Sequence, residues 1–164
     1  MTVEFDFSKF NSKGFMVLPP GQYPVKITDW YYREKEETGN KVNDIDIVFT
    51  DGEYKGETRR HWQTVTSNDK SVGAFMRMLS NLGLIKDEDR DKDGKLKVSL
   101  KFGDTDDKGR AKVVAIIVNG EERPVKDASA IAVIVNEKDD SGELRDSVDR
   151  LDAPKSKKSN SNTL

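Results

Sequence analysis

The sequence contains no cysteine and a single histidine among its 164 residues. Without cysteine, neither a disulfide framework nor a thiolate zinc site is available, and a Cys–His catalytic pair is excluded. A Ser–His–Asp triad would depend on His61, which lies within Arg59-Arg60-His61-Trp62. That setting suits phosphate contacts better than a general base. We therefore expect a protein that is not an enzyme and needs no cofactor.

Long apolar runs are also missing. No stretch approaches the ~20 apolar residues that cross a bilayer, and the first ten residues, MTVEFDFSKF, lack the basic and apolar regions of a secretion signal. These features predict a cytoplasmic protein, in the host cytoplasm if the protein is viral, without a membrane partner.

A calcium-like spacing occurs once, in Asp89, Asp91, Asp93 and Gly94. The twelfth position of that loop is Leu100, where an EF-hand requires a bidentate Glu. Asp44 and Asp46 are the one pair of carboxylates whose spacing on a strand would suit a metal nuclease. Acids on an exposed strand, however, usually serve to keep the protein soluble. We predict no metal site.

The charge is balanced, with 28 basic and 30 acidic residues and a formal net charge of −2. Acidic residues outnumber basic ones in 137–152, whereas the segment from Ala153 onward is basic and rich in Ser and Asn. A balanced body means that any nucleic-acid site must be a local basic groove.

Alternating apolar and polar residues predict strands at 22–32, 45–49, 57–65, 96–102 and 112–118, with a further apolar stretch at 128–135. Between the third and fourth of these, Val72, Phe75, Met76, Leu79 and Leu82 follow helical spacing. Asn68, Asp69 and Ser71 are candidate N-caps for this helix, and Gly83 is suited to its C-terminal end. Asn119-Gly120 is the strongest hairpin signal in the chain.

Three strands, a helix and then a closing hairpin follow the order of the OB-fold. We therefore predict a mainly β protein, a five-stranded OB-type barrel with one helix between strands three and four. A β-sandwich or a roll with one helix is the alternative. The expected organisation is an N-terminal arm at 1–18, the barrel at 19–135, and a mobile tail at 136–164 that is acidic and then rich in Ser, Asn and Lys.

The chain resembles a family of phage proteins long catalogued as having unknown function. The similarity lies in Leu18-Pro-Pro-Gly-Gln-Tyr-Pro-Val-Lys-Ile, Thr38-Gly-Asn, Phe49-Thr-Asp-Gly-Glu-Tyr-Lys-Gly-Glu, Trp62, and Phe75 to Gly83, and spans roughly residues 16–118. Several members behave like single-stranded-DNA-binding proteins and are encoded among phage replication and recombination genes. The resemblance therefore implies a role in phage DNA replication or recombination. This chain departs from the family at Glu57, where a basic residue is common.

Single-strand binding needs aromatic rings on which bases stack, next to cations that follow the phosphates. In OB-folds the ligand crosses strands two and three, flanked by the loops between strands 1–2 and 4–5. The candidates are therefore Lys26, Trp30, Tyr32, Tyr54, Arg59, Arg60, Trp62, Lys101, Arg110 and Lys112. Arg60 and Trp62, two residues apart, share one face of the third strand, and Arg59 and His61 share the other.

Two alternatives stay open for the tryptophans. Either they face the ligand, or they belong to the core, since a β-bulge in the first strand would rotate Trp30 inward. The predicted function is single-stranded DNA binding by stacking and phosphate contacts, with the acidic C-terminal segment recruiting replication or recombination proteins or keeping wrong ligands out. The rival hypothesis is a protein–protein interaction module, such as a phage accessory or host-takeover factor on the same barrel.

Overall fold

The computed structural model describes residues 1–154, and almost all of its regular structure is β. The elements are β1 (Gly21–Glu34), β2 (Lys41–Phe49), β3 (Thr58–Val65), α1 (Asp69–Asn81), a 3₁₀ turn η1 (Asp87–Asp89), β4 (Val98–Thr105), β5 (Ala111–Val118), β6 (Glu121–Pro124), β7 (Ser129–Lys138) and β8 (Leu144–Asp152). The predicted mobility of the last ten residues, 155–164, falls outside the described residues.

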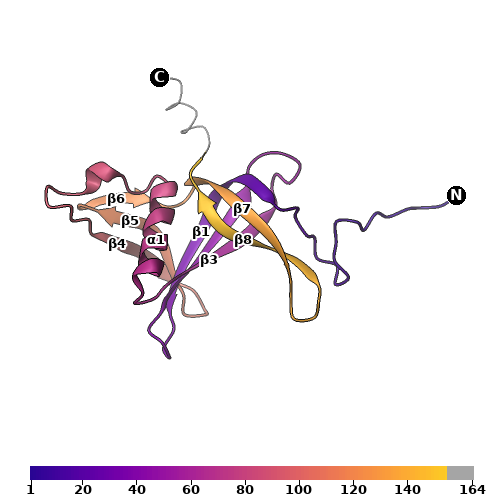
Figure 1. The fold of residues 1–164 in the computed structure, drawn as a ribbon, viewed down its shortest axis with the longest axis horizontal. Helices are drawn as coiled ribbons and strands as arrows, with labels where there is room; N and C mark the ends of the chain where they lie inside the picture. The colour runs from indigo at the N-terminus through magenta and orange to yellow at the C-terminus, as the bar shows by residue number, and fades with distance from the viewer. Residues whose placement is uncertain (155–164) are drawn as a thin grey trace, which may run out of the picture.

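β1 is the long central strand, and it is shared by two groups of strands (Figure 1). One edge of β1 pairs with β2, which pairs in turn with β3. On the other edge, residues 21–26 pair with β7 and residues 31–32 with β5. β8 pairs with β7, while β4 and β6 pair with β5. Every paired interface is antiparallel, so the strands form one branched sheet.

The prediction of a five-stranded barrel was too simple, because the sheet has eight strands and is open between β3 and β8. The main omission was β8, which we had assigned to a mobile tail. Its residues 144–152 are mostly polar, and only Leu151 among them is fully buried. The expected boundary at Val135 therefore falls inside β7, and residues 136–152 belong largely to the sheet.

The predicted helix is confirmed as α1. Asn68 caps its N-terminus by accepting a hydrogen bond from the backbone N–H of Lys70 (2.8 Å), and the buried side chains of Met78 and Leu79 join the core. Residues 119–120 form the tight turn between β5 and β6, with positive φ angles of 53° and 80°. An Asn-Gly pair adopts this conformation at little steric cost, which explains the strong local signal.

One irregularity in β1 decides which residues face the core. The pairing with β2 shifts between Ile27 and Asp29, which leaves Thr28 as an extra residue. Such a bulge reverses the orientation of every side chain that follows it. Val25 and Ile27 point inward before the bulge, and Trp30 points inward after it.

Candidate functional site

The outward side of β1, β2 and β3 carries a group of aromatic and charged side chains, which we call the outer face. It consists of Tyr31 and Arg33 from β1, Asp44 and Asp46 from β2, Arg60 and Trp62 from β3, Lys112 from β5, and Arg110 just before β5. The strand register aligns them: Lys112, Tyr31, Asp44 and Trp62 lie in one row across four strands. Asp29, Asp46 and Arg60 form the next row.

Two aromatic rings belong to this face. Trp62 is 58% exposed, although it is one of the largest side chains in the protein. Tyr31 is half-buried and lies under Arg110, whose guanidinium carbon is 4.3 Å from the centre of the ring. An exposed indole can accept a flat ligand on its surface, whereas the Tyr31 ring already has a cationic partner.

The arginines of the outer face are held by carboxylates of β2. Arg60 donates to both oxygens of Asp46, from Nε at 2.7 Å and from Nη2 at 3.2 Å. These hydrogen bonds raise the pKa of the Arg60 guanidinium. Together, the two hydrogen bonds fix the plane of the guanidinium group. The third nitrogen, Nη1, has no hydrogen bond within residues 1–154.

Asp44 holds two further arginines through one oxygen. Its Oδ2 accepts from Arg33 Nε at 3.2 Å and from Arg110 Nη1 at 3.5 Å, while its buried Oδ1 has no partner. Arg110 also donates from Nε to Asp106 at 2.8 Å, and this interaction is the main cause of its raised pKa. The long side chains of the flanking strands thus cover the middle of β2 and form an ordered layer of guanidinium groups.

Four of the ten predicted site residues come together on this face: Arg60, Trp62, Arg110 and Lys112. Lys112 Nζ lies 3.4 Å from Asp29 Oδ1. Lys26 is exposed, farther along β1, opposite Val48.

For Trp30, the second of the two alternatives is confirmed, because a bulge at Thr28 turns it to the core. The same bulge turns Tyr32 to the core side, so its expected outward orientation was wrong. Trp30 is 0% exposed, and its Nε1 donates to Asn43 Oδ1 at 2.8 Å. Tyr32 packs against Phe102 and donates from its hydroxyl to Glu34 at 2.7 Å. Burial, and then the bond to Glu34, raise the pKa of Tyr32 to about 12.

The other predicted residues lie elsewhere. Arg59 points away from Arg60 and binds Asp146 of β8, from Nε at 2.8 Å and from Nη2 at 2.9 Å. Lys101 pairs with Glu122 at 2.7 Å. Tyr54 makes an edge contact with Tyr23 and lies under Lys9 of the N-terminal segment. None of these three side chains belongs to the outer face.

Sequence reasoning missed Tyr31 and Arg33. A signal for them was present in Trp30-Tyr31-Tyr32-Arg33, because consecutive aromatic residues place at least one ring outward in either register. The bulge decides that this ring is Tyr31.

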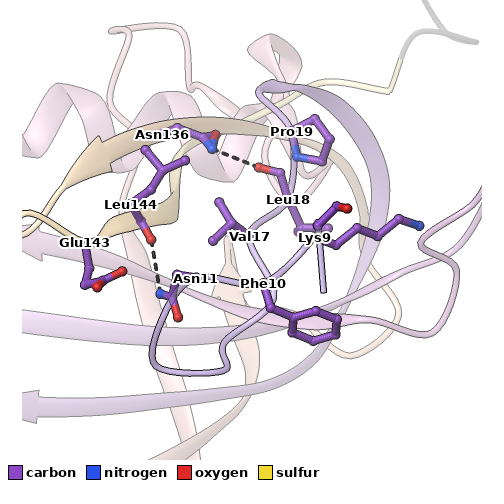
Figure 2. A pocket seen from close by; sticks show the side chains of 10 residues that line it. Lys9, Phe10, Asn11, Val17, Leu18, Pro19, Asn136, Glu143 and Leu144 are labelled. Atoms are coloured by element: carbon purple, nitrogen blue, oxygen red, sulfur yellow. Dashed lines mark hydrogen bonds between the residues drawn. The ribbon is translucent and has the colours of Figure 1, made fainter. Parts of the chain in front are cut away.

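A shallow cavity of about 270 Å³ lies apart from the outer face, between the N-terminal segment and the β7–β8 hairpin (Figure 2). Two amides hold its walls together: Asn11 Nδ2 donates to the carbonyl of Leu144, and Asn136 Nδ2 to that of Leu18, both at 3.2 Å. The cavity is lined by uncharged groups together with Lys9 and Glu143. Its wall contacts mainly attach the N-terminal segment to the sheet.

Among residues 1–154, no group of three or more His, Asp or Glu side chains has an arrangement that would hold a metal ion. The described helices are all too short or too polar to span a membrane.

Comparison with known proteins gives one similarity. A search of curated proteins finds no match. Residues 4–83 match the model of a phage-type conserved domain described as "Protein of unknown function (DUF669)". This match is consistent with the phage part of the resemblance and does not support its single-strand-binding part. It ends at Gly83, just after α1, so the chain is similar to that domain in its N-terminal segment, β1 to β3 and α1.

Proposed function

We propose that this protein binds single-stranded DNA on the outer face, in phage DNA replication or recombination. The observation that carries the proposal is Trp62, an indole exposed over more than half of its surface, two residues from Arg60 on β3 and opposite Asp44, which binds Arg33 and Arg110. Base stacking on such a ring contributes about 1–3 kcal/mol per base and tolerates any sequence. The binding is reversible and involves no chemical step.

Cations around Trp62 supply the phosphate contacts. Arg60 precedes it by two residues on β3, and Lys112 ends the row that contains Trp62. The carboxylates of Asp44 and Asp46 compete with phosphate for these cations, so the electrostatic part of the affinity should be modest. The same carboxylates hold the guanidinium groups in place, which lowers the entropy lost when a strand binds.

The proposed location goes together with an OB-type interpretation of the sheet, which is also part of this proposal. We infer that β1, β2, β3, β7 and β8 correspond to the five strands of that fold, with β4 to β6 as an insertion after the helix. The support is the proximity of β3 and β8: Arg59 binds Asp146, and His61 Nδ1 lies 3.3 Å from the carbonyl oxygen of Val148. OB-folds bind their ligands across the second and third strands, where Asp46, Arg60 and Trp62 lie.

The main test is titration of the intrinsic fluorescence with oligo-dT at low salt. Buried Trp30 should keep its emission while that of Trp62 is quenched, so the quenched component should be the one typical of an exposed indole. Trp62→Ala should weaken binding by the ~1–3 kcal/mol of one stacked base, about 5- to 150-fold. Phe15→Ala, which removes another exposed ring outside this face, is the matched control. Absence of binding at low salt, or equal affinity of Trp62→Ala and wild type, would refute the proposal.

A second test concerns the carboxylates. Asp46→Asn removes the charge that holds Arg60, so binding should tighten, and the gain should shrink as salt screens the charges. Arg60→Ala should weaken binding to all sequences. It should also reduce the slope of the logarithm of the binding constant against the logarithm of the salt concentration by about 0.7, the value of one phosphate contact. A change in sequence preference with an unchanged salt slope would contradict the phosphate role of Arg60.

One observation favours a second function, the protein–protein module. The N-terminal segment exposes several phenylalanines to solvent, and such apolar exposure is typical of protein-binding surfaces. We further propose that the acidic tip of the β7–β8 hairpin, around Asp139 and Asp140, is available to a replication or recombination partner. If oligo-dT does not bind while a phage protein does, the module is the function.

A further inference from the structure

The first eight residues form an extended apolar arm. Val3, Phe5 and Phe7 are 76%, 73% and 72% exposed, and the rings of Phe5 and Phe7 stack at 6.3 Å. They alternate with Glu4 and Asp6, so in extended conformation the arm has one apolar and one acidic face. Residues 1–6 form no backbone hydrogen bond within the described part of the chain. The arm therefore has the pattern and the free backbone of an unpaired strand.

β4 provides a free sheet edge of matching character. It pairs with β5 on one side, and no strand among residues 1–154 pairs with its other side. Val98 and Leu100 turn toward the core and are half-buried. Lys97, Ser99 and Lys101 alternate with them and are exposed, and Lys101 also pairs with Glu122 of β6 at 2.7 Å. The edge thus has one apolar and one basic face.

The arm and the β4 edge are complementary on both faces at once. When a strand is added to a sheet, its side chains continue the two faces of its neighbour. The phenylalanines would extend the apolar row of Val98 and Leu100, and Glu4 and Asp6 would lie next to the lysines. The edge of β6, which also pairs with β5, has only four residues, and its one basic residue, Arg123, is already paired with Glu121 and Asp89.

The arm of a chain is poorly placed to reach β4 of the same chain. Lys9 pairs with Glu53, and Asn11 bonds to the carbonyl of Leu144, so the root of the arm is attached beside the β7–β8 hairpin. From there the arm leads away from the body, and β4 lies at the opposite end of the long axis (Figure 1). Eight extended residues reach about 26 Å in that outward direction.

We propose that the N-terminal arm of one copy adds as a strand to the β4 edge of a second copy. The contact is head-to-tail, so each copy offers one arm and one edge, and the assembly grows into a chain or closes into a ring. This self-association goes beyond the proposed DNA binding and requires no nucleic acid.

The first test measures mass against protein concentration by sedimentation in the absence of DNA. The wild-type mass should rise above that of one chain, and deletion of residues 2–8 should keep the protein monomeric at all concentrations. Phe5→Ser with Phe7→Ser should also be monomeric. Phe15→Ser, an equally exposed ring outside the arm, should associate like wild type. A monomeric wild type, or association that survives deletion of the arm, would overturn the proposal.

Charge reversal tests the partner surface. Glu4→Lys with Asp6→Lys should weaken association at least tenfold, and Lys97→Glu with Lys101→Glu should do the same. Joining all four changes in one chain restores complementarity, so association should return. If the fourfold variant is as weak as either double variant, the arm does not bind the β4 edge. Unchanged circular dichroism in each variant shows that the fold is retained.

Cross-linking then identifies the pair of copies. The chain has no cysteine, so an Asp6→Cys protein and a Ser99→Cys protein should give a mixed disulfide when oxidised together. Lys55→Cys, exposed in the β2–β3 connection, replaces Ser99→Cys as the control and should give none. Equal cross-linking of Lys55→Cys would contradict the assignment. Oligo-dT binding by the arm-deleted monomer separates this result from that of the proposed function.

Discussion

The sheet ends in two different ways, at the junction of β3 with β8 and at the free edge of β4. At the β3–β8 junction, Arg59 is paired with Asp146, and His61 reaches the backbone of Val148, so side chains join two strands that share no backbone ladder. At the β4 edge, Lys97 makes no ion pair within residues 1–154, the exposed Lys101 pairs with Glu122, and no strand of the described part of the chain follows. Charged residues occur at both ends, but only at the junction are they buried with partners. The comparison teaches that polar strand composition by itself does not distinguish an edge that side chains join to another strand from an edge that is free.

Removing β8 tests the β3–β8 junction and should have the largest effect. A chain that ends at Lys138 loses the strand that covers β7, including the buried Leu151, and leaves Arg59 without Asp146. We expect no cooperative thermal transition, because a domain is stabilised by only ~5–15 kcal/mol and this deletion removes a whole paired strand together with a buried ion pair. A chain ending at Pro154 is the matched control and should melt like the full protein. A folded 1–138 chain would restore the boundary that we first predicted.

Asp146→Asn should have the next largest effect. The Asp146 carboxylate accepts from Arg59 and from the backbone N–H of Leu18 (2.7 Å), and its side chain is nearly buried. Because the change leaves a half-buried guanidinium without its main partner, unfolding free energy should fall by about 3 kcal/mol. Asp149→Asn, an exposed acid on the same strand, should cost less than ~1 kcal/mol. Urea unfolding curves measure both, and equal losses would show that the junction is not a stabilising contact.

His61 should make the junction sensitive to acid. Burial lowers the pKa of His61 below its ordinary 6.5, the value expected in the unfolded chain. Below pH 6.5 the unfolded state therefore binds more protons, so stability is complete above that pH and falls as pH decreases, by at most about 1.4 kcal/mol per pH unit for one proton. His61→Gln should have a flatter dependence between about pH 7 and pH 5. Asp89, whose pKa Arg123 holds at about 2, titrates below this window.

Changes at the β4 edge should have the smallest effect on stability. Lys97→Ala removes an exposed charge that makes no ion pair within residues 1–154, so unfolding free energy should change by no more than ~0.5 kcal/mol. Urea unfolding at a dilution where the protein is monomeric checks this value. A loss as large as that of Asp146→Asn would mean that the edge is part of the folded core, and the comparison of the two ends would fail.

The local elements were largely predictable. The helix has apolar residues at helical spacing and a capping Asn68, and β1 to β3 have clear alternation, so the local signal and the tertiary fold agree. β8 was not predictable in the same way. The residue of β8 that binds Arg59 is an acid, Asp146, and it is nearly buried. The sequence alone does not distinguish an acid that is buried in an ion pair from one that is solvated.

For the site, pairing Arg60 with Trp62 depended only on their spacing, and both lie on the outer face. On β1, the predicted site residues were displaced by one position. A strand has a period of two, so the extra residue at Thr28 places Tyr31 and Arg33 on the outer face, where Trp30 and Tyr32 were expected.

By itself, the sequence determined β1 to β5, the apolar stretch that forms β7, the single helix, the Asn-Gly turn and the spacing of Arg60 and Trp62, because each depends on neighbours within a few residues. It did not indicate the short β6 or β8. Only the tertiary structure decided the bulge in β1, the burial of Trp30, the joining of β3 to β8 and the exposure of β4. These features depend on contacts between residues far apart in the chain, such as Arg59 with Asp146, whose energy no local pattern contains.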